Sequence, residues 1–171
     1  MNIIEHLYHL SSQVGSELTK HNFSIATAES CTGGLLAHIL TSVSGSSNYY
    51  VGGIVAYSNR IKEKLLGVRP ETLEQHGAVS SQTAQEMAVG IREKFKTDIG
   101  LSTTGIAGPT GGTPAKPVGL VWIGLSFKAK TTTIKCQFDG DREQVKTSSV
   151  QKILQVLLND LNGQIDNQSR G

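Results

Sequence analysis

Hydrophobic residues recur at helical spacing near both ends of this chain. The first segment has apolar side chains on one face and polar ones on the others, which predicts an amphipathic helix that ends near residues 21–22. Another apolar series, between Val145 and Leu161, predicts a last helix that ends before Gly163. We expect one domain over residues 1–165, with a polar, frayed end that includes the tail 166–171.

Short apolar and β-branched runs alternate with further helical patterns between these two ends. Strands are predicted at 23–28, 51–57 and 98–104, and the runs 118–127 and 131–138 predict a β-hairpin. Helices are predicted at 35–42, around 61–66 with Gly67 as the stop, from Pro70 onward, and at about 82–95 after a serine cap.

This order of elements predicts the fold class. It is an α/β fold, a three-layer α/β/α sandwich whose mixed sheet includes one antiparallel hairpin. Ligands of open α/β sheets bind at the carboxyl ends of the strands, which here lie near Ser30, Tyr57 and Thr104.

Composition and charge exclude several classes of function. A length of 171 residues fits a single domain with a substantial core. The 16 Lys and Arg residues are interleaved with 14 Asp and Glu residues, so the basic stripe of a nucleic-acid-binding protein is missing. A single phosphorylated small molecule, which needs only one or two cations, stays a possible partner.

The two cysteines, Cys31 and Cys136, lie far apart in the chain and outside any CxxC pair. We therefore expect neither a disulfide framework nor a structural zinc site, as in a reducing compartment. The first residues lack a secretion pattern, and no stretch approaches the roughly 20 apolar residues of a membrane span. We expect a cytoplasmic protein without a membrane partner.

The turn after the first predicted strand is the main candidate for chemistry. Ser30 precedes Thr32, Gly33 and Gly34 at a helix start, where small residues leave unpaired backbone N–H groups open to an anion. Ser30 could be a nucleophile beside its own oxyanion hole. The alternative is that Ser30 or Thr32 only caps the helix, and that Cys31 is a small buried side chain.

A nucleophilic serine needs a base. The five histidines are poorly suited, because only His76 is expected in a loop. A lysine serves if its surroundings lower its pKa from about 10.4 toward neutrality. Lys62, one helical turn beyond Tyr57, is the best-placed candidate, although a lysine on a helix is usually solvated.

Two further features favour a ligand site. The loop 105–119 holds five glycines and three prolines, so it is either a long crossover or a backbone that approaches a ligand, with a Thr103 or Thr104 hydroxyl at its base. Arg142 falls in the first turn of the last helix, where the helix dipole disfavours a cation. A ligand anion or a salt bridge would explain it.

Several segments, in this order, resemble the CinA C-terminal domain family. The likeness runs from about residue 5 to 162, nearly the whole chain. A set of multi-residue motifs in order is more specific than any single glycine pattern. The segments that carry the resemblance are 28–34 (AESCTGG), 57–59 (YSN) with Lys62, 76–80 (HGAVS), 104–109 (TGIAGP) and 140–142 (GDR).

The resemblance implies a nicotinamide-nucleotide amidase, which converts nicotinamide mononucleotide to nicotinic acid mononucleotide and ammonia in pyridine-nucleotide salvage. It implies a Ser-Lys dyad, with Ser30 as nucleophile and Lys62 as base, and no metal or organic cofactor. Larger family members carry an added N-terminal pyrophosphatase-type domain that has no counterpart in this sequence, and a homo-oligomer is expected from the family.

The resemblance also implies roles for other positions. Tyr57, Thr104 and Arg142 would assist catalysis or position the reactants, with Arg142 near either the dyad or the substrate phosphate. The expected substrate contacts are Cys31, Thr32, Gly33, Gly34 and Gly105.

Two other hypotheses stay open at this point. The chain could be a non-catalytic nucleotide-binding module that acts through a protein partner, in which case Lys62 would matter little. It could instead be a cysteine amidase that uses Cys31, for which no histidine partner is evident.

Overall fold

The computed structural model describes the backbone of residues 2–168 and the side chains of residues 2–163. The helices and strands follow one another as α1 (Ile3–His21), β1 (Ile25–Glu29), α2 (Leu35–Thr41), the 3-10 helix η1 (Ser46–Asn48), β2 (Tyr50–Val55), α3 (Asn59–Leu66), α4 (Pro70–His76), α5 (Ser81–Phe95), β3 (Ile99–Gly105), β4 (Leu120–Phe127), β5 (Thr131–Gln137) and α6 (Arg142–Gln168).

The five strands form one mixed sheet in the order β2-β1-β3-β4-β5. Strand β1 is parallel to both β2 and β3, and β4 with β5 forms the antiparallel hairpin expected from the short connection. Strand β4 is also antiparallel to β3, so the long loop 106–119 reverses the chain direction. The predicted mixed sheet with a hairpin is confirmed.

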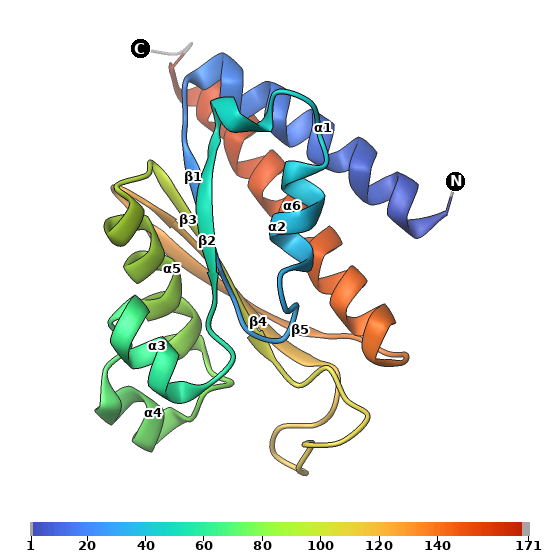
Figure 1. Cartoon of the computed structure of the whole chain (residues 1–171), viewed down its shortest axis with the longest axis vertical. Helices are drawn as coiled ribbons and strands as arrows, with labels where there is room; N and C mark the ends of the chain where they lie inside the picture. Colours follow the sequence, from blue (N-terminus) through green and yellow to red (C-terminus); the bar gives the residue numbers. More distant parts are fainter. Residues whose placement is uncertain (1, 169–171) are drawn as a thin grey trace.

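Helices cover both faces of this sheet (Figure 1), which confirms the three-layer α/β/α sandwich. The larger core lies between one face and helices α1, α2 and α6, and includes Leu18, Ile39, Leu101, Ile123 and Leu157. The smaller core lies on the other face, under α3 and α5.

The faces differ because of the residues that the strands present. Gly100 and Gly124 face α5, and a Cβ at either position would lie against a backbone carbonyl of that helix, from Ala88 or Ala84 respectively. Helix α5 therefore packs closely on the sheet.

Local sequence signals account for most element ends, with two corrections. Ser80 caps α5 through the Thr83 N–H, and Gly67 ends α3, both as expected. His76 is the last residue of α4 and not a loop residue. The last helix does not end before Gly163, and its backbone is helical as far as Gln168, so the polar end from 164 begins inside a helix. The tail at 169–171 lies outside the described residues.

Among the helices of residues 2–168, none is both long enough and apolar enough to cross a membrane.

Candidate active site

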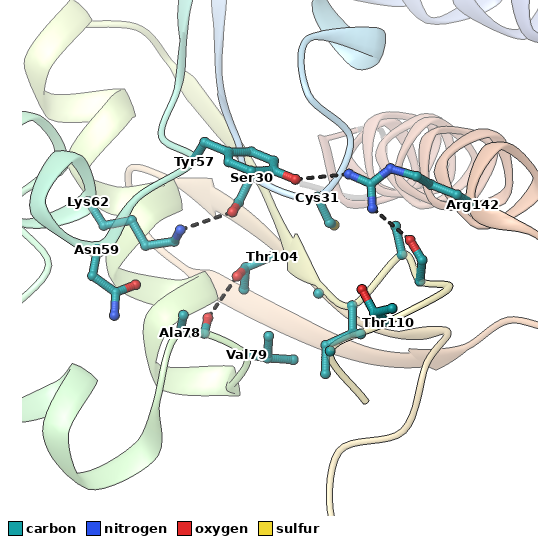
Figure 2. Close-up of a pocket in the computed structure, with 15 residues that line it drawn as sticks. Ser30, Cys31, Tyr57, Asn59, Lys62, Ala78, Val79, Thr104, Thr110 and Arg142 are labelled. Atoms are coloured by element: carbon teal, nitrogen blue, oxygen red, sulfur yellow. Dashed lines mark hydrogen bonds between the residues drawn. The ribbon is translucent and has the colours of Figure 1, made fainter. Parts of the chain in front are cut away.

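A cavity of about 330 Å³ opens at the carboxyl ends of β1 and β3, where the sequence predicts a ligand site (Figure 2). Its walls come from the turn after β1, the start of α3, the segment before α5, the loop after β3 and the first residue of α6. The lining residues are Ser30, Cys31, Tyr57, Asn59, Lys62, Ala78, Val79, Thr104, Gly105, Ile106, Ala107, Gly108, Thr110, Gly111 and Arg142.

Ser30 and Lys62 meet at the inner end of this cavity. Ser30 directly follows β1, and its backbone N–H donates to the carbonyl of Thr103 at 2.9 Å, which extends the strand pairing by one residue. Nζ of Lys62 donates to Ser30 Oγ at 2.9 Å and to the carbonyl oxygen of Ala56 at 2.8 Å. This is a distance over which a proton can pass between the two side chains.

The surroundings of Lys62 favour its neutral form. Its side chain is 1% exposed, and no carboxylate lies within ion-pair distance of it in the described part of the chain. Burial is the main cause that lowers the pKa of Lys62 below its ordinary value. The interpretation of Lys62 as a solvated surface lysine is wrong, because α3 directs it into the protein.

Cys31 lies beside Ser30 on the cavity wall but is a poor nucleophile. Burial raises the pKa of its thiol to about 12, so the reactive thiolate is scarce at neutral pH. The geometry does not favour the cysteine-amidase hypothesis.

Tyr57, Thr104 and Arg142 also line the cavity, as the sequence predicts. Arg142 donates through Nη2 to the Tyr57 hydroxyl at 2.8 Å and through Nη1 to the Gly108 carbonyl at 2.7 Å, and has no salt bridge in the described residues. The Thr104 hydroxyl donates to the Ala78 carbonyl at 2.7 Å and joins the loop before α5 to the site.

Gly105 is also on the cavity wall, and its lack of a side chain has a local reason. A Cβ there would contact the Leu120 carbonyl oxygen at 2.6 Å, so only glycine lets β3 and the start of β4 approach this closely.

The other predicted substrate contacts, Thr32, Gly33 and Gly34, are not among the cavity-lining residues. The Thr32 hydroxyl is buried and bonds to Glu29 and Thr103. The expectation of open N–H groups at this helix start needs correction, because the Glu29 carboxylate accepts from Gly34 N–H and from the next residues of α2.

The capping alternative is wrong as well. Helix α2 has Gly34 as its N-cap, without a side-chain cap bond, and neither Ser30 nor Thr32 occupies that position. Glu29 supplies the acceptor instead. Its place directly before Ser30 was visible in the sequence, but sequence reasoning missed its role and that of Asn59, which also lines the cavity.

No group of three or more His, Cys, Asp or Glu side chains that could hold a metal ion occurs within the described part of the chain. The Arg142 guanidinium on the cavity wall suits an anionic organic ligand better than a cation.

Fold and site together define the class: a three-layer α/β domain that holds a serine and a buried lysine in a cavity at the carboxyl edge of its sheet. Residues 7–161 match the CinA C-terminal domain, and the chain belongs to this family.

Known relatives agree with this membership. A CinA-like protein of Kosmotoga olearia is 57% identical over 129 residues, which cover 75% of this chain and 31% of the relative. A CinA-like protein of Rippkaea orientalis is 50% identical over 143 residues, which cover 82% of this chain and 34% of the relative. The chain thus spans about a third of the length of these curated relatives. The crystal structure of the competence damage-inducible protein A from Klebsiella pneumoniae superimposes with a TM-score of 0.89 at 37% identity, over 91% of this chain and 97% of that one.

Proposed function

We propose that this domain is a nicotinamide-nucleotide amidase that hydrolyses the carboxamide of nicotinamide mononucleotide to nicotinic acid mononucleotide and ammonia. The observation that carries the proposal is the 2.9 Å contact between Nζ of the buried Lys62 and Oγ of Ser30 at the inner end of a cavity. The choice of substrate rests on the family resemblance of the motifs around these residues.

In the first half-reaction, neutral Lys62 takes the Ser30 hydroxyl proton while Oγ attacks the carboxamide carbon. The negative charge moves to the carboxamide oxygen. The N–H groups at the start of α2 already donate to Glu29. The donors left beside Ser30 for this oxygen are the N–H groups of Cys31 and Thr32, which have no oxygen acceptor among the described residues.

The tetrahedral adduct then collapses with cleavage of the carbon–nitrogen bond. The Lys62 ammonium returns its proton to the leaving nitrogen, so ammonia departs and an ester on Ser30 remains. In the second half-reaction water attacks this ester, Lys62 takes the proton of the water, and the Ser30 oxygen leaves and regains a proton from Lys62. The product is the nicotinic acid nucleotide.

Arg142 is the proposed contact for the substrate phosphate. It lies across the cavity from Lys62 (Figure 2), and Tyr57 and Gly108 already orient its guanidinium. The other hypothesis, that Arg142 keeps Lys62 neutral by charge repulsion, is less well supported, because burial is the main cause of the lowered Lys62 pKa.

A coupled ammonia assay on nicotinamide mononucleotide tests this function, with free nicotinamide and nicotinamide riboside as controls for phosphate recognition. The wild-type protein should release ammonia from the mononucleotide. Ser30→Ala should lower kcat by roughly 10⁴-fold or more with an unchanged fold by circular dichroism.

Two results would count against the proposal. Ammonia release by Ser30→Ala at the wild-type rate would reject Ser30 as the nucleophile. Tight binding of the nucleotide by the wild-type protein without any ammonia would favour the non-catalytic binding module.

A further inference from the structure

Glu29 is a buried carboxylate directly before the proposed nucleophile, and the mechanism above does not use it. Its side chain is 1% exposed and bonds to no cation in the described residues. It accepts four hydrogen bonds, from the Thr32 hydroxyl at 2.6 Å and from the backbone N–H groups of Gly34 at 3.0 Å, Leu36 at 3.1 Å and Ala37 at 2.8 Å.

These bonds close the turn that carries Ser30. The carboxylate spans from the last residue of β1 to the first turn of α2, while Gly33 and Gly34 adopt left-handed backbone angles, with φ of 61° and 99°. Glycine adopts these angles without steric cost but has little preference for any one conformation. The bonds from Glu29, on the strand side, to the start of α2 restrict this freedom.

The carboxylate also orients two hydroxyl groups. Thr32 Oγ1 lies 2.6 Å from Glu29 Oε2 and 2.7 Å from Thr103 Oγ1. The single Thr32 hydroxyl proton goes to Glu29, so in the second bond the Thr103 hydroxyl donates to Thr32. Glu29 therefore sets one direction for the hydrogen bonds beneath the turn.

The main chain of Glu29 connects the same residue to Lys62. The Ala56 N–H donates to the Glu29 carbonyl at 2.7 Å, and the carbonyl of Ala56 accepts from Lys62 Nζ at 2.8 Å. The side chain of Glu29 thus holds the Ser30 turn, and its backbone carbonyl holds Ala56, the residue whose own carbonyl accepts from Lys62.

We propose that Glu29 is a positioning residue, which fixes Ser30 Oγ within proton-transfer distance of Lys62 Nζ. The proposal rests on the proposed function of the Ser30–Lys62 pair. It assigns Glu29 no contact with substrate. Its loss should reduce kcat more than KM, because a small displacement of the nucleophile raises the barrier without removing binding contacts.

Glu29→Gln is the main test variant. The amide keeps the shape of the side chain but has one oxygen, so either the Ala37 N–H or the three donors at Oε2 would face an NH₂ group. Thr32→Val is the second variant, in case Glu29→Gln does not fold, since it removes one donor to the carboxylate and keeps the charge.

Glu86→Gln is the matched control. Glu86 also accepts from a backbone N–H, that of Arg69 at 2.9 Å, and from a threonine hydroxyl, that of Thr72 at 2.8 Å. Unlike Glu29 it also forms a salt bridge, with the Arg69 guanidinium, and it does not line the cavity. Its substitution should lower the melting temperature without changing kcat, which separates loss of stability from loss of positioning.

The experiment measures kcat and KM for ammonia release from nicotinamide mononucleotide well below each melting temperature. We expect kcat to fall roughly 10- to 100-fold in Glu29→Gln and by a smaller factor in Thr32→Val, with KM within about twofold of wild type. Wild-type kcat in a folded Glu29→Gln or Thr32→Val protein would overturn the proposal, as would an equal loss of kcat in Glu86→Gln.

A second readout does not depend on the substrate. A fluorophosphonate probe forms a bond between Ser30 Oγ and phosphorus, fluoride leaves, and the Ser30 proton passes to Lys62; intact-protein mass spectrometry follows the rate, with Ser30→Ala as the blank. Labelling should slow in Glu29→Gln and Thr32→Val but not in Glu86→Gln.

These two readouts distinguish the two proposals. Wild-type protein that takes the label but leaves the mononucleotide intact contradicts the proposed function, and the labelling rates of the variants then decide the role of Glu29. Wild-type protein that takes no label contradicts the role of Glu29, because the turn would then not hold Ser30 in a reactive position.

Discussion

At the scale of single residues, the burial of Lys62 serves the proposed chemistry and lowers the stability of the fold. Lys62 is among the largest fully buried side chains, and among the described residues its amine bonds only to the Ser30 hydroxyl and the Ala56 carbonyl. Burial disfavours the ammonium form, which is the state that the unfolded chain prefers at neutral pH. In the proposed mechanism the same burial gives Ser30 a neutral base, so stability and activity would depend on one proton.

The effect of this proton should appear when the pH dependence of the free energy of unfolding is compared between wild type and Lys62→Met. The pKa of Lys62 is lower in the folded protein than its ordinary 10.5, so between these two values the unfolded chain binds more protons. The free energy of unfolding of wild type should therefore rise with pH relative to Lys62→Met, by at most about 1.4 kcal/mol per pH unit. Urea denaturation from pH 6 to 10 measures it.

Activity should change with pH in the same direction as stability, because both depend on the protonation of Lys62. The kcat/KM of wild type should fall as the pH drops through the folded-state pKa of Lys62, because the protonated amine cannot accept the Ser30 proton. Lys62→Met should be inactive at every pH. If the free energy of unfolding changed equally with pH in wild type and Lys62→Met, the assignment of a lowered pKa to Lys62 would be contradicted.

At the scale of secondary-structure elements, the distance between α5 and the sheet is set by small residues. Gly100 on β3 and Gly124 on β4 face the backbone of α5, so the helix packs close to the sheet and Ser102 Oγ donates to the Ala84 carbonyl at 2.6 Å. The Thr104 end of β3 and the segment directly before α5 border the cavity, so this packing helps to set its shape.

Gly100→Ala should lower the free energy of unfolding by about 1–3 kcal/mol, because the added methyl would overlap the Ala88 carbonyl and the Arg92 side chain. Gly163→Ala is the matched control: it lies within α6, and an added Cβ would meet nothing within 4 Å. It should stabilise the protein by about 0.5–1 kcal/mol through helix propensity. Chemical denaturation measures both; the same sign for the two would contradict this explanation.

At the scale of the whole molecule, the cavity unites segments from both helical layers. Arg142 comes from the start of α6 on one side of the sheet, and Lys62 comes from α3 on the other. The loop after β3 also lines the cavity and accepts from Arg142 at the Gly108 carbonyl. A ligand in this cavity would therefore contact elements that have few other contacts with one another.

Hydrogen exchange of Ser30→Ala with and without nicotinamide mononucleotide should show that the ligand contacts segments from both helical layers. We expect slower amide exchange on binding in three separated segments, 56–62, 104–111 and 142–145, which surround the cavity. Nicotinamide riboside should protect 142–145 less if Arg142 binds the phosphate. Protection confined to one segment would contradict a ligand that occupies the whole cavity.

Local patterns along the chain were enough to predict most elements of this fold. Helical spacing, glycine stops and the serine cap gave α1, α3 and α5 within a few residues, and the short connection at 128–130 gave the β4–β5 hairpin. These features are local, because propensity, capping and turn geometry depend on neighbours in the chain. The motifs also singled out Ser30 and Lys62, and through their resemblance the family.

The contacts between side chains depend on how distant segments pack, which local patterns do not show. The Lys62–Ser30 contact joins residues 32 positions apart, and the Arg142–Tyr57 bond joins residues 85 positions apart. The pattern at 30–34 indicated unpaired N–H groups at a helix start but not which acceptor reaches them, so the expected contacts at Thr32 and Gly34 gave way to the Glu29 carboxylate. Which partner a polar group finds depends on how segments far apart in the sequence pack across the sheet, and no local pattern encodes this packing.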